Sequence, residues 1–367
     1  MPKPGQVIIL LAALAVAIGI SMRFGARRSK STVGLEGSLK VEAPASSTWP
    51  RSHPMASSLD IPEPMETKGA MPLQLPREKV EEYLARHHRS AASLLAALHA
   101  MEDTNYLNEA ATNFPNDPQV QWTILARNAF PEDRRKWLDA FKSSSPSNSL
   151  ANYLSAQDYF KNGQTDAAVS ELLAATSKTQ FDSYETESRL DVVELGLASG
   201  KSQLESDTLA MSGISPDFLQ EFGTFRQLAT GTADLQKQEF AAGDAVKAGN
   251  VAQMGVVFAD QLRNGDSGKY LVNHFVGNAS EAIILSQLDP NTSYDFLDGK
   301  TPTQRLVELS QSKTELKALT ASFITIYPTL TDAEKISYSE RSKIYGELEA
   351  IRWLNQRYFV ATPNTGN

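Results

Sequence analysis

The sequence has no cysteine among its 367 residues and only five histidines. Without cysteine there is no disulfide bond, thiol nucleophile, zinc ribbon or Cys-ligated iron–sulfur cluster. Aromatic residues make up only 8% of the chain, and basic residues are outnumbered, so the net charge is −8 and the pI is 5.3. An acidic chain is poorly suited to following a phosphate backbone. We therefore expect no nucleic-acid partner.

One long apolar run is present. It occupies residues 7–22, VIILLAALAVAIGISM, and four basic residues follow it within residues 23–30. A spanning helix needs roughly 20 apolar residues, so the uncharged flanking residues must extend this run. The alternative is a cleaved signal peptide, whose apolar region has this length. Because no small-x-small cleavage site precedes the basic cluster, we favour an uncleaved anchor in residues 1–30 of a single-pass membrane protein.

The side of the membrane is not fixed by the flanking charges. Lys3 and the α-amino group precede the run, against four bases after it. The positive-inside rule alone would leave the body in the cytoplasm. A short apolar run followed by a Pro/Ser tether is also how many exported bacterial domains are held. We favour a periplasmic body and keep the cytoplasmic alternative.

Residues 31–75 are rich in proline and serine and show no sustained apolar period. Such a segment cannot bury enough apolar surface to offset the entropy lost on ordering, which predicts a disordered tether. The charge changes at its end: residues 1–75 have a net charge of +3 and the remainder −11. This balance is typical of a soluble domain held away from anionic lipid.

From residue 76 onward the apolar pattern predicts an all-α fold, since no stretch alternates long enough to form a strand. We expect short helices over 76–200 and additional helices over 201–300. Ser90 and the pair Ser215-Pro216 are expected to begin helices. Gly249-Asn250 is expected to separate two helices, and residues 277–281 to form a helix-start turn. The helix predicted over 184–198 has its apolar stripe at Leu190, Val193 and Leu197.

Two helices predicted over 150–161 and 164–176 resemble a tetratricopeptide (TPR) repeat. The residues that match the small, aromatic, turn and packing positions of that family are Ala156, Tyr159, Gly163, Ala168, Leu172 and Ala175. Small residues let the paired helices approach closely, and larger ones pack against the next repeat. The resemblance implies a short array of TPR-like helical hairpins.

The resemblance covers residues 84–180 and has departures. Asn152 replaces the usual aromatic residue, and Gln180 stands where a terminal proline is expected. Two less regular units precede this one and end at Pro115 and Pro146, which are 31 residues apart. The chain also resembles uncharacterised membrane-anchored bacterial proteins of this kind, which bring no activity to carry over.

Residues 301–360 show the most regular pattern. Leu309, Leu316 and Phe323 recur every seven residues, and Thr331 with Glu334 forms a capping-box pattern before a second apolar stripe. Two long helices joined by a short loop should pack antiparallel. We therefore predict a long C-terminal helical hairpin.

Patterns that resemble chemical sites fit structural roles better. Residues 196–202 look like a phosphate-binding loop, but they have three residues between the glycines where the motif has four, and they follow a predicted helix. His87 and His88 are adjacent and face different directions on a helix, while His99 and His274 stand alone. We therefore assign no metal, no cofactor and no catalytic residue.

The leading functional hypothesis is a non-catalytic scaffold. Stacked hairpins form a concave surface that binds an extended peptide or helix of a protein partner. The resemblance implies that the first helix of each unit lines this groove. The polar residues that we expect to contact the partner there are Gln121, Asn128, Asn152 and Gln157. The alternative for these four is plain solvent exposure.

Two other functions stay open. In the first, the hairpin at 301–360 self-associates, which would make the protein a structural homo-oligomer of the envelope. In the second, the chain is an all-α hydrolase that uses carboxylates such as Glu239 and Asp244. Scattered acids are common on an acidic protein, so we expect no enzyme.

Overall fold

The computed structural model describes residues 75–359, and within that range the chain is all-helical, as predicted. It contains fourteen α-helices and four short 3-10 helices, with no β-strand among the described residues. The predicted anchor at 1–30 and the tether up to residue 74 lie outside the described residues. Of the helices inside that range, none combines the length and the apolar character needed to cross a membrane.

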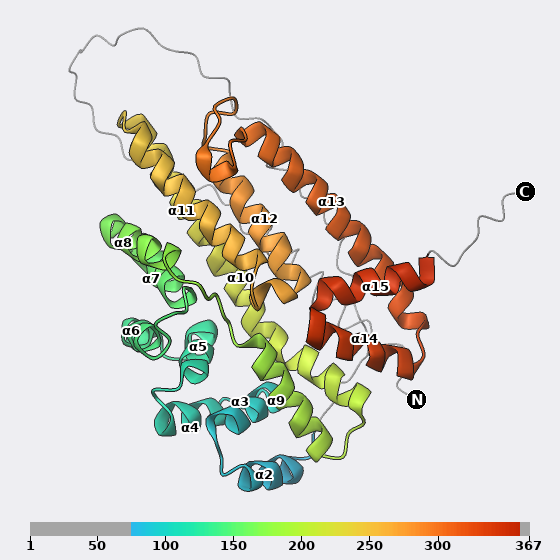
Figure 1. Cartoon of the computed structure of the whole chain (residues 1–367). Helices are drawn as coiled ribbons and strands as arrows, with labels where there is room; N and C mark the ends of the chain where they lie inside the picture. The colour runs from blue at the N-terminus through green and yellow to red at the C-terminus, as the bar shows by residue number, and fades with distance from the viewer. Residues whose placement is uncertain (1–74, 360–367) are drawn as a thin grey trace, which may run out of the picture.

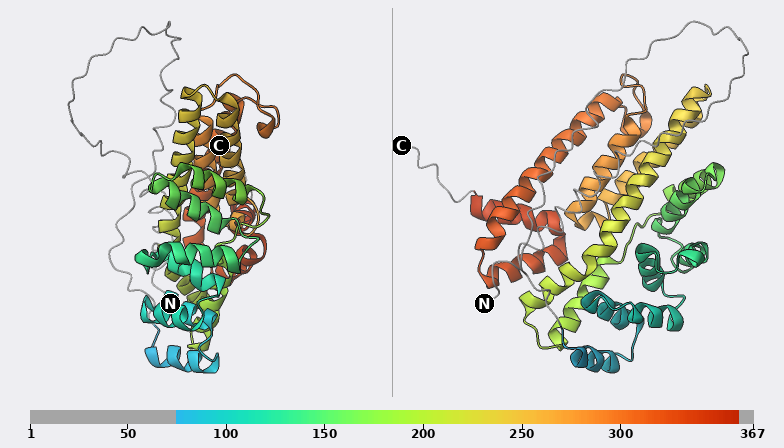
Figure 2. Two further views of the ribbon diagram at one scale, coloured as in Figure 1. Left: turned by 90° about the vertical axis from the view of Figure 1, so that its left-hand side faces the viewer. Right: turned by 180° about the vertical axis from the view of Figure 1, so that it is seen from behind.

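Short helices form a layer along one side of the molecule, and each of α3 to α8 contacts the next (Figures 1 and 2). We call these six helices the array. Ser90 begins α3 as predicted, because its hydroxyl accepts a hydrogen bond from the Ser93 N–H. The helices of this layer are α2 (Arg77–Arg86), α3 (Ala91–Met101), α4 (Asn105–Asn113), α5 (Pro118–Arg127), α6 (Arg134–Ser144), α7 (Leu150–Lys161) and α8 (Thr165–Thr176).

The α7–α8 pair is the hairpin that the sequence predicts. Helix α7 has the predicted bounds, and Ala156 in α7 is fully buried against the second helix. On α8, Ala168, Leu172 and Ala175 are buried, whereas the neighbouring Leu173 is 63% exposed. Small buried residues therefore do bring these two helices together.

Two long helices, α10 (Gln203–Ala241) and α11 (Ala245–Arg263), separate the array from the rest of the molecule (Figure 1). The largest apolar core cluster runs from Leu75 to Leu262, so the array shares one core with α9, α10 and α11. The elements of this central part are α9 (Glu185–Ala198), α10 (Gln203–Ala241), α11 (Ala245–Arg263), η4 (Ser267–Lys269) and α12 (Leu271–Leu285).

The helix start predicted at Ser215-Pro216 is wrong, because both residues lie inside the 39-residue helix α10. The helix begins instead after Ser202, whose hydroxyl accepts from the Glu205 N–H in a capping box. An interior proline costs a helix about 3 kcal/mol. The many contacts that α10 makes with α7, α9, α11 and α12 offset that cost.

Two further predictions fail because packing, not local propensity, decides them. Gly249-Asn250 does not separate helices, since both residues lie within α11. The stripe predicted for α9 is only partly buried: Val193 is buried, but Leu190 and Leu197 are 48% and 44% exposed. The face that α9 buries instead includes Gly196, where a Cβ would come within 2.6 Å of the Ser206 Oγ of α10. Close approach of the backbones selects this face.

Residues 277–281 form no turn and lie in the middle of α12. A Cβ on Gly277 would meet the Ala259 carbonyl oxygen at 2.8 Å, which is too close for any side chain. The missing side chain therefore lets α11 and α12 pack tightly against each other.

The C-terminal region begins as predicted and then departs from a simple hairpin. Leu309, Leu316 and Phe323 are buried along one stripe, and Thr331 with Glu334 forms the predicted capping box. The second arm, however, breaks at Gly346, where φ is +90° and a Cβ would lie 2.9 Å from the Lys269 Cα. The elements are η5 (Asp295–Leu297), α13 (Pro302–Ile326), η6 (Tyr327–Thr329), α14 (Asp332–Tyr345) and α15 (Glu347–Phe359).

The break changes what packs against what. Helix α15 contacts both α13 and α14, so the three helices form a corner instead of two long antiparallel rods (Figure 1). The predicted long hairpin is therefore wrong in its second arm.

Candidate interaction surface

The surface predicted to be a partner groove is filled by the chain itself. The first helices of the three units are α3, α5 and α7, and α10 contacts all three. The contact is close: a Cβ on Gly231 of α10 would come within 3.1 Å of the Phe160 ring of α7. Helix α10 thus occupies the position at which a TPR-like array would hold a partner.

Three of the four predicted groove residues accordingly do not line an open surface. Gln121 is 1% exposed and donates to the Pro115 carbonyl at 2.8 Å, while its own carbonyl accepts from Ser144 at 2.5 Å. Asn152 is 5% exposed and donates to Glu171 at 2.6 Å.

The other two residues differ from each other. Gln157 is 8% exposed, and its amide donates to Gln227 of α10 at 2.8 Å, so the predicted contact with a partner is made within the chain. Asn128 alone is exposed. It ends α5 in a left-handed conformation with φ of +48°.

The candidate catalytic and metal-binding residues have structural partners. Glu239 forms an ion pair with Lys247 at 2.7 Å, and Asp244 accepts from the Lys247 N–H at 2.9 Å, so both hold the α10–α11 turn. The His274 Nε2 lies 2.8 Å from the Gly268 carbonyl oxygen, and burial lowers the pKa of this histidine. No cluster of three or more potential metal ligands occurs among residues 75–359.

His87 and His88 follow the end of α2, where His88 is exposed in a left-handed conformation, whereas His87 and His99 contact other side chains of the fold. His87 lies against the Tyr83 ring at 4.1 Å and near the Glu194 carboxylate at 3.7 Å. His99 is 3% exposed, with its Nδ1 3.4 Å from the Arg127 guanidinium.

A cavity of about 60 Å³ lies where α9, α10, η4 and α14 meet. Its polar lining includes Arg189, Asp207, Tyr338 and Lys343, and Lys343 pairs with Asp207 at 2.9 Å. This volume holds a few water molecules, at about 10–15 Å³ each, and no organic substrate of ordinary size. Its charged groups balance one another in pairs, so we assign the cavity no reaction.

A buried carboxylate lies beside this cavity. Both Nε and Nη2 of Arg189 donate to Oε1 of Glu185, while Oε2 of Glu185 is buried without a hydrogen-bond partner. Desolvation therefore raises the pKa of Glu185 to about 7, although Arg189 opposes the shift. The nearby Glu347 also disfavours the charged form.

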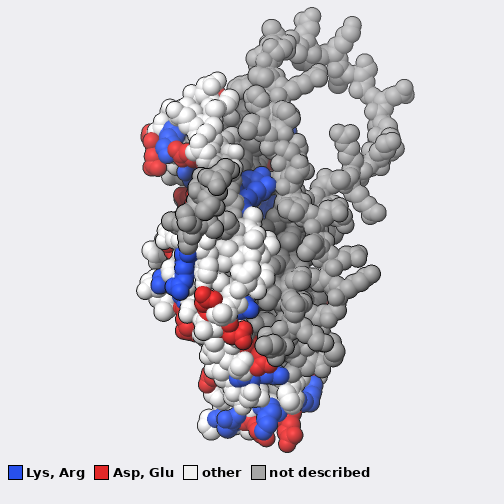
Figure 3. Space-filling view, turned by 90° about the vertical axis from the view of Figure 1, so that its right-hand side faces the viewer, with Lys and Arg blue, Asp and Glu red and all other residues white. Residues whose placement is uncertain are grey.

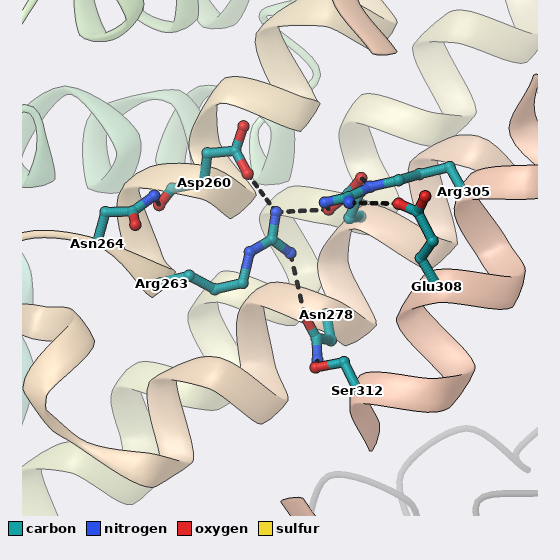
Figure 4. A network of polar contacts seen from close by, with 8 residues as sticks. Asp260, Arg263, Asn264, Asn278, Arg305, Glu308 and Ser312 are labelled. Carbon is teal, nitrogen blue, oxygen red and sulfur yellow. Dashed lines mark hydrogen bonds and ion pairs between the residues drawn. The ribbon is translucent and has the colours of Figure 1, made fainter. Parts of the chain in front are cut away.

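A second buried carboxylate joins three helices (Figure 4). Glu281 of α12 is 0% exposed and accepts from Arg263 of α11 at 2.5 Å and from Arg305 of α13 at 2.6 Å. Arg263 also donates to Asn278, whose amide donates in turn to Ser312 of α13. We call this set the polar layer. Each of its strongest charges has a partner, which fits a structural role.

A different arrangement lies on the surface of α14 and α15. Arg341 stacks on the rings of Tyr345 at 5.3 Å and Trp353 at 4.8 Å. Arg357 lies over Trp353 at 5.7 Å and over Tyr358 at 5.9 Å. Cations and rings thus alternate across the two helices, and we call these five residues the Arg–aromatic ladder.

The ladder is partly exposed, and the Glu334 carboxylate, which accepts a hydrogen bond from the Tyr358 hydroxyl, attracts Arg357 without forming an ion pair with it. Tyr345 is 59% exposed, and the adjacent Ile344 is 65% exposed. Neither Arg341 nor Arg357 forms an ion pair with any described residue, whereas Arg352 beside them pairs with Glu315 and Glu349. Trp353 also packs against the C-terminal core, which fixes the ladder on rigid helices.

The same side of the molecule has no uniform charge. Basic and acidic residues are interspersed over the described part of the face in Figure 3. The ladder is therefore a local pair of cations among aromatic rings, and it differs from the extended basic surface that binds nucleic-acid backbones.

The ladder was not identified from the sequence, although part of its pattern joins residues that are close in the sequence. Arg341 with Tyr345, and Trp353 with Arg357, are four residues apart, which places each pair on one helix face. The contact between the two pairs depends on the break at Gly346. Only the folded chain brings Arg341 to Trp353.

Comparison of the chain with known protein families, curated proteins and solved structures finds no match.

Proposed function

We propose that this protein is a non-catalytic, membrane-tethered helical scaffold that binds a protein partner through the Arg–aromatic ladder. The observation that carries the proposal is the partly exposed alternation of cations and rings formed by Tyr345, Arg341, Trp353, Arg357 and Tyr358. Arginine, tryptophan and tyrosine are enriched among the few residues that dominate the binding free energy at protein interfaces. In the ladder they are already stacked, so little side-chain entropy is lost on binding.

The array supports this proposal indirectly. Its inner face contacts α10, and its predicted polar contacts are used within the chain. The array and α10 together therefore act as the rigid body that presents α14 and α15.

The binding proposal is tested by site-specific photocrosslinking in the full-length protein in its own host cells. A photoreactive residue at Tyr345 is expected to trap one protein in a discrete band, and Arg341→Glu with Arg357→Glu is expected to abolish that band. Leu173, which is 63% exposed on α8, provides the matched control position. Equal labelling from both positions, or a band that survives the charge reversal, would remove the ladder from the proposal.

The location of the body is part of the same proposal. We place it on the periplasmic side, held by residues 7–22 and the tether. Protease treatment of intact cells and spheroplasts, with a tag after Asn367, tests this. Digestion in spheroplasts alone supports a periplasmic body. Protection until lysis places it in the cytoplasm, as the count of flanking charges favours.

A further inference from the structure

The chain contains a segment whose chemistry complements the ladder. Residues 59–66, LDIPEPME, hold three carboxylates and no base, giving a net charge of −3. They include three of the five acids of the first 75 residues. Leu59, Ile61 and Met65 are interspersed with these acids, and two prolines restrict the backbone. The segment therefore offers both negative charge and apolar contact at low entropic cost.

We infer that residues 59–66 of the same chain bind the Arg–aromatic ladder. This inference rests on the proposed function, because it names an occupant of the surface that also binds the partner. The carboxylates pair with Arg341 and Arg357, which have no ion-pair partner among the described residues. The apolar side chains cover the exposed Ile344 and Tyr345.

The covalent connection favours this occupant over other acidic peptides. Glu66 is nine residues before Leu75, where the described body begins, and Asp60 is fifteen residues before it. Extended chain of these lengths reaches about 30 and 50 Å. A compact body of the size of residues 75–359 has a radius of gyration of about 19 Å. The segment can therefore reach other faces of its own body.

The covalent connection also determines how tightly residues 59–66 must bind the ladder. A short flexible linker holds its ligand at an effective concentration on the order of 1 mM. A segment too weak to bind as a free peptide is therefore bound for much of the time in cis. A partner must compete with it, so the ladder selects partners with higher affinity than the tether.

The absence of cysteine makes the contact measurable without background. In the full-length protein, Met65→Cys is combined either with Tyr345→Cys on the ladder or with Leu173→Cys on α8, and disulfide formation is followed under a mild oxidant. Both surface positions are exposed, at 59% and 63%. We expect the ladder pair to form an intramolecular disulfide at least about tenfold faster, because docking raises the local concentration of the tether cysteine.

Charge reversal decides whether the ladder causes the difference. Arg341→Glu with Arg357→Glu should reduce the rate to that of the α8 pair, and Asp60→Arg with Glu63→Arg in the same chain should restore it. The unfolding midpoint of each variant shows that the body is intact. Equal rates for the two cysteine pairs, rates unchanged by charge reversal, or disulfides formed mainly between two chains would each overturn the inference.

A separate arm distinguishes this inference from the proposed function. Asp60→Asn, Glu63→Gln and Glu66→Gln together remove the charge of the segment and leave the ladder untouched. If the tether is the occupant, photocrosslinking of the partner from Tyr345 should increase several-fold. Unchanged partner crosslinking would refute the tether as occupant while the proposed function stands. Loss of the partner band only after reversal of Arg341 and Arg357 supports the proposed function by itself.

Discussion

The two sides of α10 are held together by different means. On the array side, one continuous apolar cluster extends from Leu75 to Leu262. On the other side there are two smaller clusters, one around Ile284 and Leu309 and the other around Leu316 and Phe323. Along α12, Asn278 and Glu281 of the polar layer lie between residues of these two clusters, and along α13 Ser312 does.

This difference shows what determines the alignment of the helices in each region. Apolar packing tolerates small shifts between helices, because any close-packed arrangement buries similar area. A buried carboxylate between two guanidinium groups has few good geometries, so it defines how α11, α12 and α13 align. The array thus combines its apolar cluster with partly exposed polar contacts, such as the pair of Lys142 with Glu171, whereas the region beyond α10 contains a carboxylate that is fully buried.

The largest effect should come from breaking the polar layer. Glu281→Gln leaves Arg263 and Arg305 with no carboxylate between them, and we expect the free energy of unfolding to fall by about 3–5 kcal/mol. Chemical denaturation of the purified full-length protein measures this. Glu349→Gln removes an exposed ion pair and is the control, with an expected loss below about 1 kcal/mol.

A triple replacement sharpens the comparison. When Glu281, Arg263 and Arg305 are all replaced by methionine or leucine, most of the lost stability should return, since no buried charge is left alone. A triple variant as unstable as Glu281→Gln would contradict the view that the layer specifies alignment more than it adds stability.

A neighbouring pair of leucines tests the array side. Leu172→Ala removes a side chain that is 1% exposed between α7 and α8, and we expect a loss of about 3 kcal/mol. Leu173→Ala changes the next residue, which is 63% exposed, and should change stability by less than about 0.5 kcal/mol. Similar losses for both would show that α8 packs with a different face.

The buried Glu185 predicts a pH dependence. Its pKa is raised from 4.5 to about 7, so between these values the folded chain keeps a proton that the unfolded chain has lost. The free energy of unfolding should therefore fall as the pH rises through this window, by at most about 3 kcal/mol, and then level off. Denaturation at a series of pH values measures this fall.

Glu185→Gln should reduce the slope of that part of the curve, because the amide does not titrate, and should leave the contribution of Asp191, whose pKa burial raises to about 6. Glu132→Gln, at an exposed position before α6, is the control and should leave the curve unchanged. A slope of opposite sign in the unmodified protein would mean that Arg189 outweighs desolvation.

The smallest effect compares two helical glycines beyond α10. Gly277→Ala puts a methyl group 2.8 Å from the Ala259 carbonyl oxygen and should cost about 1–3 kcal/mol. Gly249→Ala in α11 meets nothing within 4 Å and should stabilise the protein by up to about 1 kcal/mol. Thermal unfolding of both variants provides the test. Destabilisation by Gly249→Ala as well would contradict the open space around that residue of α11.

The sequence predicts local features in both regions. The bounds of α7, the start of α3 and the stripe of Leu309, Leu316 and Phe323 follow from local periodicity and caps, and all are observed. Features that depend on a distant element were not predictable in this way. Glu281 stands alone in an apolar helix, and nothing near it in the sequence indicates its partners 18 and 24 residues away.

The candidate surfaces show the same limit. Gln121, Asn152 and Gln157 were placed on the correct helices, whereas Asn128 follows the end of α5. Their exposure depended on whether another part of the chain covers them. The contact of Gln157 with Gln227 joins residues 70 positions apart. The ladder depends on the helix break at Gly346. A side chain at this position is excluded by the nearby backbone of Lys269, which is distant in the sequence.

The long helix α10 also limits how this architecture can change by duplication. An open solenoid lengthens freely when one repeat is copied, since each repeat contacts only its neighbours. Here every inner helix of the array also rests on α10. Another inner helix would need about 10 Å more of α10, or six to seven residues at about 1.5 Å each. The number of hairpins is therefore tied to the length of one helix, and the two can change only together.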